Sequence, residues 1–237
     1  MALANPLPRA GFADLLRTAD IRLVQGWQQQ RSATGGGETR YADRAPALWR
    51  ADVRLAAMPN AEAEGIMALI NSRAGGLKTV LLYNSRMPCP ASDPDGSIMG
   101  STVPRLGTIT DRLHVAFTGF PPDYVIPLGT YFGIVFDTSR YYLGQFVEPR
   151  TANGAGAVAQ TEIWPPLPAS IAGTPGVRFI RPPAKFRIEP GSAFAPSVDL
   201  VNATVQFTAE QTYSAVGAGD VVIPTPDHVP TYLYLGF

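Results

Sequence analysis

One cysteine and two histidines are the side chains of this sequence best suited to nucleophilic or general-base chemistry. Cys89 lies between Pro88 and Pro90, while His114 and His228 belong to different segments. A catalytic thiol needs a histidine or another cation beside it to lower its pKa. His114 alternates with apolar neighbours as on a strand face, and His228 lies in a proline-rich stretch. The pattern therefore favours structural roles for all three residues.

Glycine-rich and acidic stretches match known site motifs only in part. Gly35–Gly37 lacks the Gly-Lys-Ser/Thr of a phosphate loop, and Gly96–Gly100 lacks the spacing of a Gly-x-Ser-x-Gly nucleophile elbow. Residues 93–96 begin like a calcium loop but have no bidentate Glu at the required distance. Glu62 and Glu64 would lie about 200° apart on a helix, too far for an acid–base pair. We therefore expect no enzyme, no catalytic residues, no metal and no cofactor.

Aromatic residues are the remaining candidates for ligand contact. Trp27, Trp49 and Trp164 can stack on a sugar or a base, although such residues more often anchor a core or an interface. A carbohydrate-binding module for host attachment is therefore an alternative prediction. The residues on which this alternative rests are Trp164, Tyr131, Tyr141 and Tyr142.

Composition limits the classes of function further. The 237 residues are 46% hydrophobic and only 16% charged, and 19 Lys and Arg balance 19 Asp and Glu. Zero net charge argues against broad electrostatic capture of nucleic acid or an anionic membrane, and it mildly favours a protein that works inside an assembly. One cysteine excludes an internal disulfide. We also expect no signal peptide and no membrane-spanning segment, and synthesis in the cytoplasm of the producing cell.

The elements that must position these residues centre on residues 49–83. Residues 49–56 alternate large apolar and charged side chains, which predicts a strand with one buried face. Asn60 is a predicted N-cap, and apolar residues recur at helical spacing over 61–74. Glu62 and Glu64 fit the first turn and Arg73 the last, before a glycine stop. Residues 78–83 form a second strand.

A long hairpin is expected before this unit, over residues 21–56. Residues 21–27 read as a strand, the polar stretch 28–38 as a loop or hairpin tip, and Thr39 as the start of the return. Five or so short strands follow between 105 and 180, which suggests a small barrel or sandwich.

Proline-rich stretches separate these parts of the chain. They predict one domain from 1–91 plus 183–237 and an inserted β domain at 92–182. Residues 184–210 should pair with the strands of 49–83. The apolar end of the chain, 232–237, is expected to dock on its own chain or on a neighbour.

Three stretches of the sequence resemble the distal tail proteins of long non-contractile-tailed bacteriophages. They are Trp49-Arg50-Ala51-Asp52-Val53-Arg54-Leu55-Ala56, the helix 61–74, and Lys78-Thr79-Val80-Leu81-Leu82-Tyr83-Asn84-Ser85-Arg86-Met87-Pro88. Residues 127–132 and 152–167 also resemble phage tail sequences, with Thr130 and Asn153 in place of acidic residues. The resemblance covers most of residues 45–190.

The resemblance implies a mainly β fold, a tail-tube-like split β-sandwich with one flanking α-helix. The inserted domain would be a small β-barrel or sandwich, of oligonucleotide-binding-barrel or galectin-like type. It also implies a homo-oligomer, a hexameric ring that joins the tail tube protein to the tail hub and fibres. Genomic DNA and the tape-measure protein would pass through its channel without specific binding. The expected location is the virion, at the tail tip.

In this interpretation the hairpin lines the channel and pairs with neighbouring subunits. The candidate contact residues on it are Arg22, Gln25, Trp27, Gln29, Arg31, Glu38 and Arg40. Other tail components, such as a tube, terminator or neighbouring hub protein, remain alternatives. A peptidoglycan hydrolase would need a carboxylate pair or a metal triad, and neither is visible in the sequence.

Overall fold

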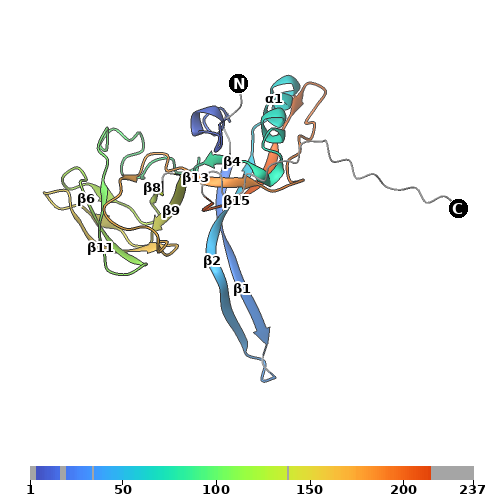
Figure 1. Cartoon of the computed structure of the whole chain (residues 1–237). Coiled ribbons are helices and arrows are strands. Elements are labelled where there is room, and N and C mark those ends of the chain that lie inside the picture. Colours follow the sequence, from blue (N-terminus) through green and yellow to red (C-terminus); the bar gives the residue numbers. More distant parts are fainter. Residues whose placement is uncertain (1–3, 17–19, 34, 138, 215–237) are drawn as a thin grey trace, which may run out of the picture.

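The computed structural model describes residues 4–16, 20–33, 35–137 and 139–214. Within these ranges the protein is mainly β, with one α-helix and antiparallel pairing between all named strands. Figure 1 shows three parts: a body that carries the helix, a separate β lobe, and a long two-stranded ribbon that projects from the body.

The body is built on a five-stranded sheet with the order β1-β2-β15-β13-β4. Its strands are β1 (Asp20–Ala33), β2 (Thr39–Arg54), β15 (Gln206–Gln211), β13 (Ala184–Ile188) and β4 (Thr79–Leu82). The predicted pairing of the returning segment is confirmed, because β15 pairs with β2 and β13 pairs with β4. A second, two-stranded sheet joins β3 (Met58–Pro59) to β14 (Asn202–Ala203).

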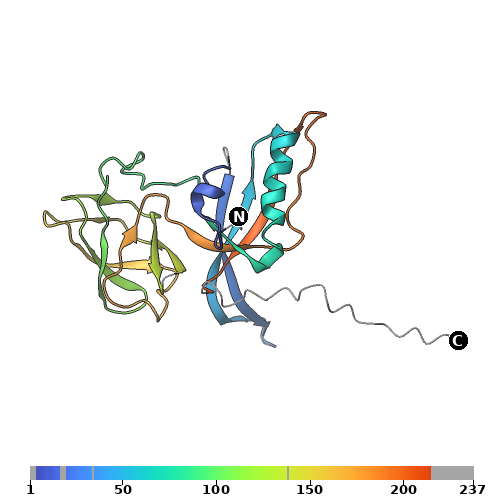
Figure 2. The same ribbon diagram turned by 45° about the horizontal axis from the view of Figure 1, so that its top comes forward.

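One face of the five-stranded sheet is apolar and covered. Trp49, Ala51 and Val53 of β2 are buried, whereas the residues between them are exposed, as the alternating sequence predicts. The covering elements are α1 (Asn60–Asn71) and the turns around η1 (Arg9–Gly11), whose residues join the same hydrophobic cluster. Figure 2 shows α1 on the side of the body away from the β lobe.

The helix exists as predicted, but its two ends differ from the prediction. Pro59 is the N-cap, and the Asn60 side chain instead donates a hydrogen bond to the Leu200 carbonyl. Only Glu62 lies in the first turn. The helix ends at Asn71, and Ala74 then takes a left-handed conformation before η2 (Gly75–Leu77).

Arg73 was predicted for the last turn of the helix, and this is wrong. It lies after the helix, its side chain is buried, and its guanidinium donates to the Ala4 carbonyl and the Ser72 hydroxyl. It therefore holds the N-terminal residues rather than the end of the helix.

The β lobe, residues 105–178, has a six-stranded sheet with the order β12-β8-β9-β11-β6-β5 and a small β10-β7 pair. The bounds are β5 (Arg105–Ile109), β6 (His114–Thr118), β7 (Val125–Ile126), β8 (Tyr131–Phe136), β9 (Arg140–Phe146), β10 (Arg150–Thr151), β11 (Val158–Trp164) and β12 (Val177–Arg178). Strands were predicted at β6, β8, β9, β11 and β12, whereas β5, β7 and β10 were missed. The lobe has its own aromatic cluster, in which the rings of Phe117, Phe132, Phe146 and Phe179 contact one another.

Candidate assembly surface

The ribbon formed by β1 and β2 extends well beyond the sheet that carries it. The two strands pair from Asp20 opposite Arg54 out to Ala33 opposite Thr39, but β15 pairs only with residues 50–54 of β2. The outer part of the ribbon, residues 27–46, therefore has two strands, and apart from its root, where Trp27 contacts Trp164, it projects away from the body (Figure 1). Isolated two-stranded hairpins are marginally stable in water. The outer ribbon thus has little of the packing that normally stabilises strands.

The predicted tip of the hairpin was too long. Residues 28–33 continue β1 and are paired, so the turn itself is confined to the glycine-rich residues before Thr39. A hydrogen bond of 2.7 Å from the Gln29 amide to Asp43 links the two strands within this polar stretch. Polar composition alone had suggested a loop, but cross-strand pairing keeps the residues extended.

Two β-bulges mark the root of the outer ribbon. The register shifts between Gly26 and Gln28 and again between Gln28 and Gln29, so β2 contains two extra residues there. Pro46 lies in this bulged part, where a residue without a backbone N–H is tolerated. Bulges increase local twist, and these two occur where the ribbon leaves the body.

The outer edge of β1 is open along its length. β1 is the first strand of its sheet, and no described strand pairs with its other side. Near its start, the Ile21 N–H donates to the Ser85 hydroxyl instead of to a strand. An open edge of 14 residues is a template for pairing with another chain, and proteins normally cover or interrupt such edges.

The seven predicted contact residues all lie on the ribbon, but they do not share one surface. Alternation along β1 places Gln25, Trp27, Gln29 and Arg31 on one face and Arg22 on the other. Arg40 stands opposite Ser32, on the same face as Arg22. Glu38 forms an exposed ion pair with Arg40 at 3.8 Å. Sequence reasoning missed Tyr41, which is 64% exposed beside them and was noted only as part of the return strand.

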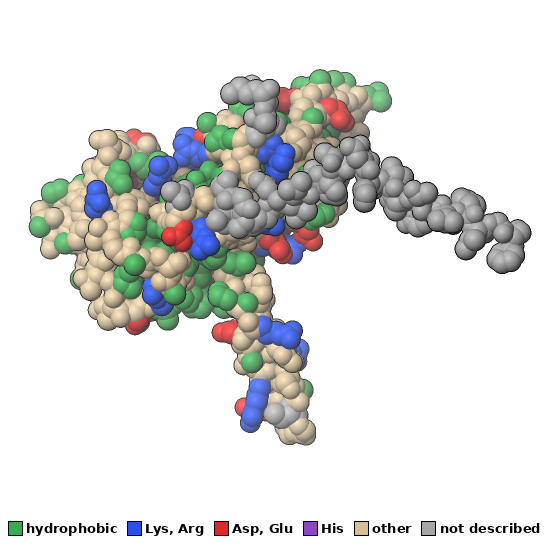
Figure 3. Space-filling view, in the orientation of Figure 1, with side chains coloured by type: hydrophobic (Ala, Val, Ile, Leu, Met, Phe, Trp, Pro, Cys, Tyr) green, Lys and Arg blue, Asp and Glu red, His purple; other side chains and the backbone are tan. Residues whose placement is uncertain are grey.

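Charge along the ribbon and the open sheet face has both signs. Figure 3 shows Lys or Arg and Asp or Glu side chains on the projecting ribbon. At the base, the Arg86 guanidinium holds Asp20 through two contacts of 2.5 and 2.6 Å, and these hydrogen bonds lower the pKa of the Asp20 carboxyl. Arg50 lies 3.6 Å from Asp52 and 3.4 Å from Glu189. Positive and negative side chains are therefore interspersed on this surface, and neither sign dominates.

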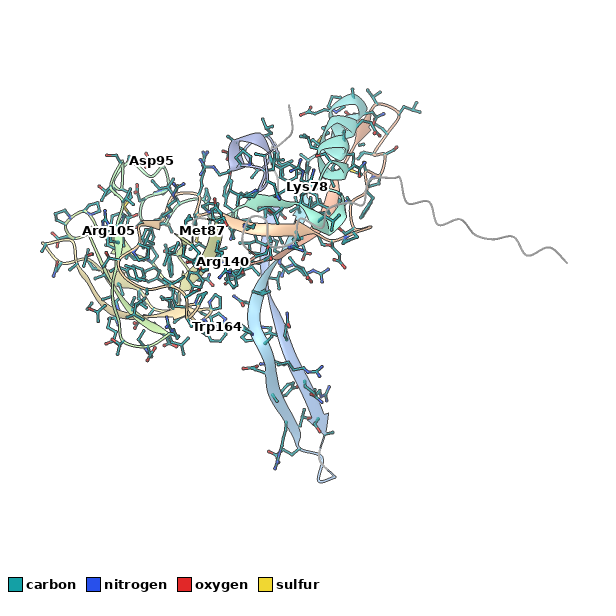
Figure 4. All side chains as sticks on the ribbon, in the orientation of Figure 1. Lys78, Met87, Asp95, Arg105, Arg140 and Trp164 are labelled. Atoms are coloured by element: carbon teal, nitrogen blue, oxygen red, sulfur yellow. The ribbon has the colours of Figure 1, made fainter. Side chains whose placement is uncertain are left out.

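Three of the four aromatic residues proposed for glycan contact, namely Tyr131, Tyr141 and Trp164, share one face of the β8-β9-β11 sheet. Tyr131 and Trp164 both stand opposite Gln145, and alternation places Tyr141 on the same side of β9. This face is turned toward the body and the ribbon, and Figure 4 shows Trp164 on that side of the lobe. Gln145 separates Tyr131 from Trp164, and Tyr141 lies four residues away along β9, so the three side chains share a face but do not form one contiguous aromatic platform.

Packing already accounts for these rings, however. Tyr131 is buried against Trp49, with ring centroids 5.5 Å apart, and the Trp49 indole N–H donates to the Leu143 carbonyl at 2.8 Å. Trp164 contacts Trp27 of the ribbon at 5.5 Å. The Tyr141 ring lies 5.9 Å from the Lys185 ammonium. Tyr142 is buried on the other face, where its hydroxyl donates to the Pro165 carbonyl at 2.5 Å.

A groove remains between the ribbon root and the loop that follows β11. Its volume is about 560 Å³, and its walls come from both the ribbon and the lobe. The lining residues are Trp27, Asp43, Arg44, Ala45, Pro46, Ala47, Arg112, Trp164, Pro165, Pro166, Leu167, Pro168, Ala169 and Tyr213.

The cysteine, histidine and aspartate residues that could take part in catalysis or metal binding have surroundings that fit a structural role. Burial raises the pKa of the Cys89 thiol, and the His114 ring contacts Asp111 at 2.8 Å. Asp93 is buried and accepts backbone N–H groups from Ile98 and Met99, so its carboxylate stabilises a turn. His228 lies outside the described residues.

No group of three or more metal-ligating side chains occurs among the described residues. No helix in the described part of the chain has the length and hydropathy needed to cross a bilayer.

Comparison with known proteins gives no family: no protein-family model matches the sequence, and no curated protein matches it.

Proposed function

We propose that this chain is a structural subunit that assembles into a ring at the distal end of a bacteriophage tail. The resemblance to distal tail proteins implies that the ring is hexameric. The ring would join the tail tube to the tail-tip hub and fibres around the DNA channel. The observation that carries the proposal is the ribbon, which projects from the body with an open β1 edge. The tail context comes from the resemblance of residues 45–190 to distal tail proteins.

The proposed mechanism of assembly is strand addition. Each subunit would offer the edge of β1 to a strand of its neighbour, which satisfies backbone groups and removes an aggregation-prone edge. Each backbone hydrogen bond would contribute about 0.5–1.5 kcal/mol, so several are needed to hold a ring. Such a contact joins two different surfaces of neighbouring subunits. A series of these contacts closes into a ring when the rotation from one subunit to the next is a whole fraction of a full turn.

The proposal includes a division of the chain into two domains. Residues 1–91 and 183–237 would form a tail-tube-like split sandwich with a flanking helix, and residues 92–182 an inserted β domain of oligonucleotide-binding-barrel or galectin-like type. In support, strands β5–β12 pair only with each other among the described strands, and the lobe has a separate hydrophobic cluster.

The proposed partners are copies of this chain, the tail tube protein, the tail hub and the tape-measure protein. A channel for DNA must not hold it tightly, and the balanced net charge and mixed-sign ribbon suit that role. In this proposal the protein is not an enzyme and acts in the virion.

A carbohydrate-binding attachment module is the second candidate. The observation in its favour is the groove beside the half-buried Trp164, which has aromatic walls. A glycan array with the full chain tests it. Binding that is lost in Trp164→Ala would support this candidate, and a flat array would remove it.

Substitution on the β1 edge tests strand addition. Arg31→Pro removes an N–H that alternation directs away from β2, and it is expected to abolish ring formation. Arg31→Ala is the matched control, because it loses the same side chain and keeps the N–H. Sedimentation of both variants measures assembly. A ring that forms equally well with Arg31→Pro would refute pairing at this edge.

A further inference from the structure

The groove at the ribbon root is preformed and mostly apolar. Trp27 is 54% exposed, and its ring contacts Trp164 across the groove. The Arg112 guanidinium donates to the carbonyls of Pro168, Ala169 and Ile171 at 3.1–3.3 Å, which fixes the loop that forms one wall. Exposed apolar surface of this kind marks a binding site more often than chance would give.

The described chain ends at the margin of this groove. After β15, the Thr212 N–H donates to the Lys185 carbonyl, and Tyr213 lines the groove with its ring packed against Phe136. Ser214 is held by two side chains of β13, because its carbonyl accepts from Lys185 at 2.7 Å and its hydroxyl accepts from Arg187 at 3.2 Å. The last described residue of the chain therefore lies close to the groove.

The sequence that follows has the chemistry to fill it. Residues 215–220 form a short linker with two glycines, and Val221-Val222-Ile223-Pro224-Thr225-Pro226 comes next. Each proline fixes its own φ and biases the preceding residue to an extended conformation. Extended proline-containing segments bind in grooves lined by aromatic rings.

Distance and charge are compatible with such binding. Six linker residues span at most about 20 Å, enough to cross from the margin of a groove into it. A short linker also gives a millimolar effective concentration, so weak contacts suffice. Asp220 and Asp227 flank the apolar stretch, and Arg44 and Arg112 are among the lining residues.

We infer that residues 221–226 of this chain bind in the groove between the ribbon root and the loop after β11, within the same subunit. Bound there, the segment covers Trp27 and Trp164 and ties the ribbon to the lobe. The orientation of the ribbon relative to the lobe then depends on the C-terminal segment. This inference concerns a single subunit and does not depend on the proposed ring.

Cysteine cross-linking of the full chain tests the inference. In a Cys89→Ser background, Ala169→Cys in the groove wall is combined with Thr225→Cys and exposed to a mild oxidant. We expect an intramolecular disulfide that forms about tenfold faster than in a control pair, Ala155→Cys with Thr225→Cys, because docking adds to the linker's effective concentration. Adding Ile223→Asp should remove that difference.

Tryptophan fluorescence gives an independent measurement without new cysteines. Trp49 is 3% exposed, so acrylamide quenching reports mainly on Trp27 and Trp164. Ile223→Asp should increase quenching, whereas the control Leu235→Asp should not.

Several results would overturn the inference. They are equal cross-linking rates for the two pairs, disulfide-linked dimers in place of the intramolecular product, and no change in quenching for Ile223→Asp. Dimers would mean that the groove takes the segment of a second copy. Protection of the tryptophans by an added glycan, with equal cross-linking rates, would assign the groove to carbohydrate.

Discussion

Gln25 lies at the root of the ribbon with both amide atoms enclosed. Neither atom has a hydrogen-bond partner among the described residues. A buried amide without a partner costs about 1–3 kcal/mol, so the position would be better filled by an apolar side chain in an isolated subunit. No contact among the described residues explains a polar side chain at this position.

Replacing Gln25 tests the cost of this unpaired amide. Gln25→Met keeps the size of the side chain and removes the unpaired amide, so the free energy of unfolding of the monomer should rise by about 1 kcal/mol. Urea denaturation measures it, with exposed Gln28→Met as the control that should change little. A less stable monomer would contradict the account.

Asp20 and Arg86 predict a dependence of stability on acid. The Arg86 hydrogen bonds lower the Asp20 pKa in the folded state, so the stabilisation is present above the unfolded pKa, about 3.9, and is lost as the pH falls through the folded pKa. Asp20→Asn should therefore flatten the fall of the melting temperature below about pH 4. In an Arg86→Gln background the same substitution should have little further effect. If the melting temperature of Asp20→Asn falls below pH 4 as steeply as that of the unsubstituted protein, the Asp20–Arg86 pair does not contribute to the acid dependence of stability.

At the scale of elements, local pattern predicted the strand, helix and strand of residues 49–83 and their pairing partners. It failed at the helix ends, because Arg73 is used by the N-terminal residues and Ala74 adopts the left-handed conformation usually left to glycine. It also missed the two-residue strands β7 and β10, which are too short to show alternation.

The aromatic residues show why a site is harder to predict than an element. The sequence shows the residue types of Trp49, Tyr131 and Trp164 but does not show whether they bind a sugar or pack between two sheets. The distinction depends on contacts across more than 80 residues of chain, such as Trp49 to Leu143. The groove itself combines residues near 45, 112, 165 and 213, and no local spacing indicates it.

The β1 edge gives a prediction at the same scale. The Ile21 N–H points away from β2, and the Trp49 N–H points away from β1 toward Gln211, so odd-numbered residues of β1 direct their backbone groups outward. Amide exchange at Leu23 and Gln29 should slow when subunits assemble. Exchange at the even-numbered Val24 and Gln30, already directed at β2, should change less. Equal exchange at Leu23 before and after assembly would exclude pairing at this edge.

At the scale of the whole molecule, a body, a lobe and a projecting ribbon make a shape that leaves much surface without a partner (Figures 1 and 3). The ribbon carries Trp27, which is 54% exposed although its ring contacts Trp164, and Tyr41, which is 64% exposed. Few charges and zero net charge give such a molecule little protection against self-association. These properties suit a subunit whose ribbon is buried by its neighbours.

Class averages of the purified protein, alone and mixed with its tail partners, test the central claim most directly. The account predicts a six-fold ring with a central channel, with the ribbons at the contacts between subunits. A monodisperse monomer that stays monomeric beside its tail partners would contradict it.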